Sequence, residues 1–215
     1  MIKLCVFDYD GVIVQTETIH VHKMMDMLKE FDIQYSMEDI SVLMGGNKLT
    51  RPVLMEKRFG DQETFKKNRQ KVLTGHRTIY PPADQIKTPH IKEILFYLQE
   101  QEIHITLCSN SSLDRVREGL KQIEIDSYFE CLYSGMESGH AKPDPYIYLS
   151  AMKQFQAYPN ETLVIEDSEV GIHGAKLSGA YVAALKDPDG LSVQHEADWI
   201  IKDLLEIKSI VKERQ

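Results

Sequence analysis

The sequence predicts an α/β protein whose parallel sheet is covered by helices on both faces. The first observation is an apolar run at residues 3–7, which is typical of a buried strand. The second is the alternation of short apolar runs with helical patterns from residue 103 onward, which implies right-handed crossovers between parallel strands. The third is a helical segment without a convincing strand between these two parts, which predicts an insertion directly after the first strand.

The insertion opens with a one-faced helix. Apolar residues recur at the i, i+3, i+4, i+7 spacing of a single helix face, at Val21, Met24, Met25, Leu28 and Phe31. Helical and polar segments continue to about residue 77, and Tyr-Pro-Pro-Ala-Asp at residues 80–84 is typical of a linker. We therefore predict a core domain of residues 1–16 and 84–215 and a helical domain of residues 17–83.

Helical and strand patterns alternate regularly in the rest of the core. Thr88 and Pro89 resemble the N-cap and first residue of a helix, and Ser112 is a candidate cap for another. A third helix begins near Pro145, a small-residue helix covers residues 168–178, and a final helix closes the chain. The expected strands of this part occupy residues 103–108, 131–133, 162–165, 180–185 and 199–201.

Composition limits the partners. The 215 residues are 42% hydrophobic and 27% charged, as in soluble globular proteins, and the formal net charge is −8. This charge argues against binding of nucleic acid or of anionic membranes. It leaves room for a small anionic substrate, because local lysines and a metal ion can reverse the field within one cleft.

Cysteine use and hydropathy bear on the compartment. Cys5, Cys108 and Cys131 each lie in or beside an apolar run, so we expect buried free thiols in a reducing compartment. From the residues given, we expect neither a signal peptide nor a membrane-spanning stretch. We expect a cytoplasmic protein without a membrane partner and a monomer, with an oligomer left open.

Polar residues follow several of the expected strands. In open parallel sheets, ligands bind outside the carboxyl ends of the strands. The candidates are Asp8 and Asp10, Ser109 and Asn110, Lys142 in the loop GHAKPDP, and Glu166 and Asp167. Each one alone has an ordinary structural explanation as a turn residue, a helix cap or a solvated surface charge.

Together these residues supply what phosphoryl transfer requires. Asp8 can act as a nucleophile that forms an aspartyl-phosphate, and Asp10 can serve as general acid and then general base. Asp8, Asp167 and a backbone carbonyl are the hard oxygen ligands that Mg²⁺ prefers. Ser109, with the amides of the following helix start, can hold phosphate oxygens, and Lys142 adds a fixed positive charge.

The order of four motifs resembles one known family. DYDGV at residues 8–12, CSNSS at 108–112, AKPDPYIY at 141–148 and VIEDSEVGIHGAKLSGA at 164–180 resemble the haloacid dehalogenase superfamily, within its β-phosphoglucomutase-like branch. The motifs span almost the whole chain, and the match lies in their order and spacing. The resemblance implies a Rossmann-like core with a helical-bundle cap inserted after the first motif.

The resemblance also implies roles for single residues. Asp8 resembles the family's nucleophile, and Asp10 its acid/base residue, whose carbonyl also binds the metal. Ser109 and Lys142 resemble the residues that bind phosphate and stabilise charge, with Asn110 beside them. Asp167 resembles the direct Mg²⁺ ligand. Glu166 resembles a ligand that binds the metal either directly or through water.

Two positions depart from the family, and the helical domain is less informative. Gln15 stands where relatives usually carry an acid, which puts hinge behaviour in doubt, and Thr88-Pro89-His90 stands where they commonly have a Pro-Gly turn. His20 is a candidate substrate-binding residue, although its spacing to apolar neighbours also fits a packing residue. Lys48 is a second candidate, and a solvated lysine at a helix start is an equal alternative.

Three functions stay open at this point. The leading hypothesis is an Mg²⁺-dependent phosphatase for a small phosphorylated metabolite, with a phosphosugar as one candidate. The second is a phosphoglucomutase-type isomerase, which would return the phosphoryl group to its substrate. The third is a non-catalytic regulatory protein, against which the complete set of Asp8, Asp10, Lys142 and Asp167 argues. Dehalogenation is less favoured, because Asp10 and the Mg²⁺ ligands suit phosphate chemistry.

Overall fold

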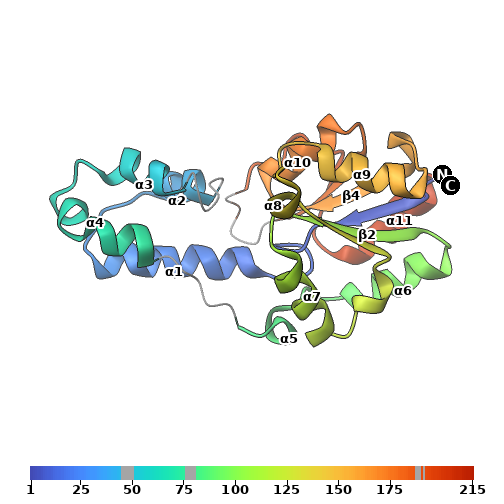
Figure 1. The fold of residues 1–215 in the computed structure, drawn as a ribbon, viewed down its shortest axis with the longest axis horizontal. Coiled ribbons are helices and arrows are strands. Elements are labelled where there is room, and N and C mark those ends of the chain that lie inside the picture. The colour runs from blue at the N-terminus through green and yellow to red at the C-terminus, as the bar shows by residue number, and fades with distance from the viewer. Residues whose placement is uncertain (45–50, 76–80, 187–189, 191) are drawn as a thin grey trace. The chain divides into compact units, whose positions relative to one another are not determined.

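The computed structural model describes residues 1–44, 51–75, 81–186, 190 and 192–215 (Figure 1). The chain divides into two compact units. The core unit comprises Met1–Gln15, Pro81–Asp187 and Val193–Gln215. The helical unit comprises Thr16–Tyr80 and Pro188–Ser192. None of the described helices combines the length and the apolar character that crossing a membrane requires.

The core unit is built on a six-stranded sheet in the order β3-β2-β1-β4-β5-β6, and every neighbouring pair is parallel. The predicted α/β fold with a parallel sheet is thereby confirmed. The strands are β1 (Leu4–Phe7), β2 (His104–Ser109), β3 (Cys131–Ser134), β4 (Thr162–Glu166), β5 (Tyr181–Leu185) and β6 (Trp199–Ile201).

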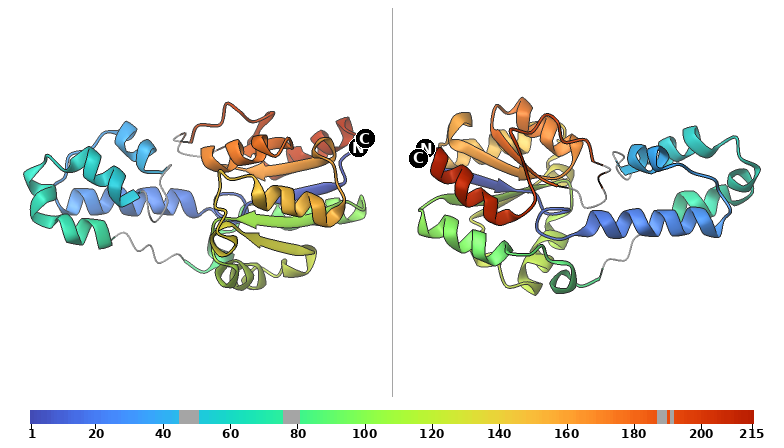
Figure 2. Two further views of the ribbon diagram at one scale, coloured as in Figure 1. Left: turned by 45° about the horizontal axis from the view of Figure 1, so that its top comes forward. Right: turned by 180° about the vertical axis from the view of Figure 1, so that it is seen from behind.

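Helices cover both faces of this sheet, as Figures 1 and 2 show. The helices of the core unit are α5 (Ala83–Ile86), α6 (Ile91–Glu100), α7 (Leu113–Gln122), α8 (Gly135–Ser138), α9 (Tyr146–Phe155), α10 (Glu169–Leu177) and α11 (Ile207–Glu213). Three short 3₁₀ helices accompany them, η1 (Asp126–Tyr128), η2 (Pro159–Glu161) and η3 (Leu204–Glu206).

Strand β1 is apolar and buried at every position. Side chains alternate between the two faces of a strand, so a strand covered on both sides needs apolar residues throughout. Cys5 and Phe7 belong to the core cluster that includes α6, α7 and α11. Leu4 and Val6 belong to the cluster that includes α9 and α10. The three cysteines are free thiols, with Cys131 only half-buried.

Two segments of the core unit pair with each other outside the sheet. Val14 and Lys87 form an antiparallel bridge, which is extended by hydrogen bonds from Gln15 N to Ile86 O (2.7 Å) and from Thr88 N to Ile13 O (2.9 Å). Helix α6 begins later than the sequence indicated, because His90 rather than Thr88 is its N-cap. His90 has φ 61°, a left-handed conformation of the kind that favours glycine.

The described helices of the helical unit are α1 (Thr16–Glu30), α2 (Met37–Met44), α3 (Arg51–Phe59) and α4 (Glu63–Gly75) (Figure 1). They share an apolar core of their own. Its largest members include Leu28, Leu43, Met55, Phe59 and Phe65. The unit therefore has the separate hydrophobic core that marks a compact folding unit.

Candidate active site

The candidate site lies at the carboxyl ends of three adjacent strands. Asp8 directly follows β1, Ser109 is the last residue of β2, and Glu166 is the last residue of β4. Strand β1 lies between the other two, and all three are parallel. Their carboxyl ends therefore meet at one edge, so residues more than 100 positions apart in the sequence become neighbours there.

The turn after Asp8 requires a glycine. Gly11 has φ +84°, and a Cβ added to it would lie 1.9 Å from Asp167 Oδ2. A side chain at this position would occupy the space of the Asp167 carboxylate. The hydrogen bond from Gly11 N to Val14 O (2.7 Å) closes the turn and holds the backbone close to that carboxylate.

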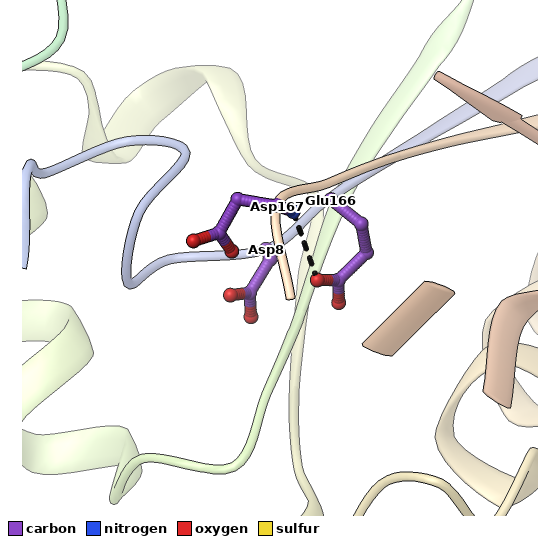
Figure 3. A group of neighbouring side chains, drawn as sticks. All are labelled: Asp8, Glu166 and Asp167. Atoms are coloured by element: carbon purple, nitrogen blue, oxygen red, sulfur yellow. Dashed lines mark hydrogen bonds between the residues drawn. The ribbon is translucent and has the colours of Figure 1, made fainter. Parts of the chain in front are cut away.

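Three buried carboxylates gather at this point. Asp8, Glu166 and Asp167 each offer one oxygen, and these atoms all lie within 4.8 Å of one another. Figure 3 shows Asp8 and Asp167 projecting to the same side, with Glu166 extending away from them. Carboxylates this close repel one another unless protons or cations compensate their charge. Their hard oxygen donors fit a divalent cation such as Mg²⁺ or Ca²⁺.

Lys142 supplies the positive charge within this group. Its buried Nζ donates to Asp8 Oδ1 (2.6 Å) and also to Glu166 Oε1. Burial lowers the pKa of Lys142, yet the Asp8 and Glu166 carboxylates outweigh this effect and raise the pKa above its usual value. The lysine therefore stays charged and forms a fixed cation beside Asp8.

The pKa of Asp8 lies above its ordinary value in this cluster. Burial raises the pKa of Asp8 to about 8, and Lys142 opposes the rise. The negative charges of Glu166 and Asp10 add further to the rise. A cation placed beside Asp8 would favour its ionised form, which is the form that a nucleophile needs.

Glu166 is held from several sides. The Tyr148 hydroxyl donates to Glu166 Oε1 (2.8 Å), and the Ser168 hydroxyl donates to Oε2 (3.2 Å). Burial raises the pKa of Tyr148 well above its usual value, so the hydroxyl keeps its proton and acts as a donor. Gly171 leaves room for the carboxylate, because a Cβ there would lie 2.2 Å from it. Ser168 also caps α10 by accepting from Gly171 N.

Asn110 forms hydrogen bonds with the main chain of Lys142. Its Oδ1 accepts from Lys142 N (2.8 Å), and its Nδ2 donates to Lys142 O (3.4 Å). The side-chain amide therefore pairs with the backbone of Lys142. Its predicted contact with substrate stays a prediction. Ser109 is buried beside it and accepts from Ser111 N (3.0 Å).

Asp10 has partners that sequence reasoning missed. Arg115, on the first turn of α7, donates from Nη2 to Asp10 Oδ1 (2.6 Å) and from Nη1 to Oδ2 (2.7 Å). Ser111 donates to the same Oδ2 (2.6 Å). The Arg115 guanidinium also lies over the Tyr9 ring, 5.2 Å from its centroid. No local pattern in the sequence indicates this contact, because Asp10 and Arg115 are 105 positions apart.

The Tyr9 hydroxyl packs against α7 at Gly119, which has no side chain. A Cβ added to Gly119 would lie 1.7 Å from the Tyr9 hydroxyl oxygen, so only glycine leaves space for that hydroxyl. Arg115 and Gly119 are four residues apart and share one face of α7. The same face of the helix therefore contacts two successive residues of the first motif, Tyr9 and Asp10.

The two remaining predicted site residues are His20 and Lys48. His20 is buried on α1 of the helical unit. Lys48 lies outside the described residues. The core unit thus brings together Asp8, Asp10, Ser109, Asn110, Lys142, Glu166 and Asp167, whereas the contribution of the helical unit stays a prediction.

Comparison with known proteins agrees with this arrangement of fold and site. A family model described as haloacid dehalogenase-like hydrolase matches residues 5–185. A solved structure of a conserved haloacid dehalogenase-like protein of unknown function from Agrobacterium tumefaciens is 25% identical, with a TM-score of 0.76 and 99% of each chain covered. The protein is therefore a hydrolase of α/β fold. The chain belongs to the haloacid dehalogenase-like hydrolases, and the resemblance found in the sequence is confirmed.

Curated relatives carry different activities in their names. A phosphorylated carbohydrates phosphatase of Thermotoga maritima is 24% identical, over 81% of this chain and 80% of the relative. Pyrophosphatase PpaX of Oceanobacillus iheyensis is 28% identical, over 98% of this chain and 97% of the relative. The β-phosphoglucomutase of Bacillus subtilis is 27% identical, over 85% and 83%. Relatives at such identity support phosphate chemistry in general and leave the substrate open.

Proposed function

We propose that this chain is an Mg²⁺-dependent phosphatase that acts on a small phosphorylated metabolite through an aspartyl-phosphate on Asp8. Phosphosugars are the first substrate class to test. The observation that carries the proposal is the Asp8 carboxylate, which contacts the Lys142 ammonium and lies in the same acidic group as Asp167. The phosphatase names of two relatives support the same chemistry.

In the first step, an Asp8 oxygen attacks phosphorus and forms a P–O bond, while the bond to the leaving oxygen breaks. Asp10 gives its proton to that oxygen, so the product leaves as a neutral alcohol. Lys142 remains beside Asp8 and offsets the charge that gathers on the transferring group. Ser109, buried at the end of β2, is the proposed contact for the phosphate oxygens.

In the second step, a water oxygen attacks the phosphorus of the aspartyl-phosphate and the bond to Asp8 breaks. Asp10 now takes the proton of the attacking water, which regenerates its acid form together with free phosphate. In the structure Arg115 and Ser111 donate to both oxygens of Asp10, so substrate binding has to free one of these oxygens before Asp10 gives or takes its proton.

The chemistry of the donor set fits Mg²⁺. Asp8 and Asp167, with the main-chain carbonyl of Asp10, are the proposed ligands, and Glu166 is a further one, direct or through water. When bound, the ion supplies positive charge that offsets the repulsion between a carboxylate nucleophile and a phosphate. Burial raises the pKa of Asp8, so a bound cation would favour the ionised form that attacks phosphorus.

A phosphoglucomutase-type isomerase is the second candidate, supported by the name of one relative. Both activities use Asp8, and they differ in whether water or a substrate hydroxyl receives the phosphoryl group. We propose that His20, in the helical unit, contributes more to the activity of a mutase than to that of a phosphatase.

A panel of phosphorylated metabolites separates the two candidates. Wild-type enzyme and His20→Ala are assayed with Mg²⁺ on β-glucose 1-phosphate and on simple phosphate esters, with free phosphate and isomeric product both measured. Release of phosphate, little altered in His20→Ala, is the expected result. Interconversion of glucose phosphates that is selectively lost in His20→Ala would replace the phosphatase by the mutase.

A further inference from the structure

One buried polar side chain lies near the candidate site and has no part in the proposed chemistry. Gln194 belongs to the segment between β5 and β6, and its side chain is almost fully buried. Its Nε2 donates to two main-chain oxygens, Asp167 O (2.7 Å) and Leu185 O (2.8 Å). A side-chain amide nitrogen carries two hydrogens, so these two bonds use both of them.

The two acceptors occupy equivalent positions on neighbouring strands. The pairing of β4 with β5 ends at Glu166 and Ala184. Asp167 and Leu185 are the next residues in the same register, one step beyond the last pair. Gln194 therefore ties the two strand ends together where the sheet pairing stops. The strand end that it holds is the one from which the Asp167 carboxylate projects.

Asp167 is held at three places, and Gln194 provides one of them. The Asp167 N–H donates to Glu166 Oε2 (3.2 Å), and its carboxylate lies against Gly11, where a Cβ would come within 1.9 Å. The carbonyl is held by Gln194. Without this bond and its partner to Leu185 O, the end of β4 is no longer tied to the end of β5, and the main chain that carries the Asp167 side chain is held less firmly.

We propose that Gln194 is a positioning residue that fixes Asp167 and thereby sets the affinity of the site for its divalent cation. The inference rests on the proposed function, in which Asp167 is a ligand of Mg²⁺. Partners that orient a metal ligand commonly change metal affinity or activity by about 10- to 100-fold when removed. A purely structural buried amide would instead change the stability of the fold and leave metal affinity unaltered.

The test compares two variants that each remove one buried side-chain hydrogen-bond donor, one at each end of β4. Gln194→Met keeps the length and apolar stem of the side chain but removes both hydrogens. Thr162→Val is the matched control, because buried Thr162 lies at the opposite end of β4 and donates to Tyr158 O (3.0 Å). The readouts are the melting temperature as a function of Mg²⁺ concentration without substrate, and the Mg²⁺ concentration that gives half-maximal phosphate release.

We expect Gln194→Met to need about tenfold more Mg²⁺ than wild type in both measurements. At saturating Mg²⁺, its KM for a phosphate ester should stay close to that of wild type. Thr162→Val should melt at a lower temperature with an unchanged Mg²⁺ requirement. Equal Mg²⁺ requirements in Gln194→Met and wild type, or an equal rise in Thr162→Val, would overturn the inference.

Two further outcomes are informative. If Gln194→Met does not fold, Gln194→Asn, which keeps the amide on a shorter stem, replaces it, and an unchanged Mg²⁺ requirement there overturns the inference. If wild type itself responds to Mg²⁺ in neither measurement, the metal of the proposed function is wrong and the inference falls with it. A wild type that responds, beside a Gln194→Met that responds equally, overturns the role of Gln194 alone.

Discussion

Replacing Gly119 by alanine should damage catalysis far more than stability. The new Cβ would lie 1.7 Å from the Tyr9 hydroxyl, and Cβ contacts below 3.0 Å essentially do not occur, so the hydroxyl has to move by about 1.3 Å. Crowding of this kind costs roughly 1–3 kcal/mol. Alanine is better than glycine within a helix by about 1 kcal/mol, which offsets part of this cost. The expected net destabilisation is therefore about 0–2 kcal/mol.

The effect on turnover follows from the position of Tyr9 between Asp8 and Asp10. Displacing Tyr9 shifts both carboxylates, and a misplacement of about 1 Å can lower a rate about 100-fold. We expect kcat for phosphate release to fall about 100-fold in Gly119→Ala, with a modest change in melting temperature. The control is Lys121→Ala, an exposed position on the same helix, which should retain activity.

A second substitution tests the cause. Tyr9→Leu removes the ring atoms that the new methyl group would meet, so the double variant Gly119→Ala, Tyr9→Leu should be at least about tenfold more active than Gly119→Ala. Tyr9→Leu alone provides the reference for the loss of the ring. Full activity in Gly119→Ala, or a double variant no better than it, would refute the view that α7 positions the first motif through Tyr9.

The other predictions concern the charged groups. Asp8→Asn should retain its fold and release no phosphate, since an amide cannot form the aspartyl-phosphate; turnover by the pure variant would contradict covalent catalysis. Because the folded pKa of Asp8, about 8, exceeds its ordinary value of 3.8, the metal-free protein should lose stability as pH rises between these values, by up to about 1.4 kcal/mol per unit. Melting curves in chelator should show this slope in wild type and not in Asp8→Asn. Tyr148→Phe removes a donor to buried Glu166 and should lower both melting temperature and kcat, and an unaltered kcat would limit Tyr148 to packing. Arg115→Met should lower kcat about 10- to 100-fold with little change in KM, and Arg115→Lys should restore part of it, if orientation of Asp10 is what Arg115 provides.

The sequence by itself determined the sheet and the polar residues that gather at its carboxyl edge. Apolar runs mark strands because a strand buried on both faces needs apolar side chains throughout, as at Leu4–Phe7. Polar residues directly after such runs lie at the strand ends whatever the details of packing, so Asp8, Ser109 and Asp167 could be predicted to meet. Both inferences depend on local pattern and on the direction of parallel strands.

Only the tertiary structure decided which side chains support these residues. Arg115 contacts Asp10 across 105 positions of the chain, and Gln194 contacts Asp167 across 27. Position 119 needs glycine because the Tyr9 hydroxyl occupies the space of a side chain there. The helical pattern around Gly119 does not indicate that contact. Periodicity indicates which face of an element is apolar and will be buried, because that pattern repeats within one element. Which polar atoms meet depends on how separate elements pack and in what register, and the local sequence does not encode that.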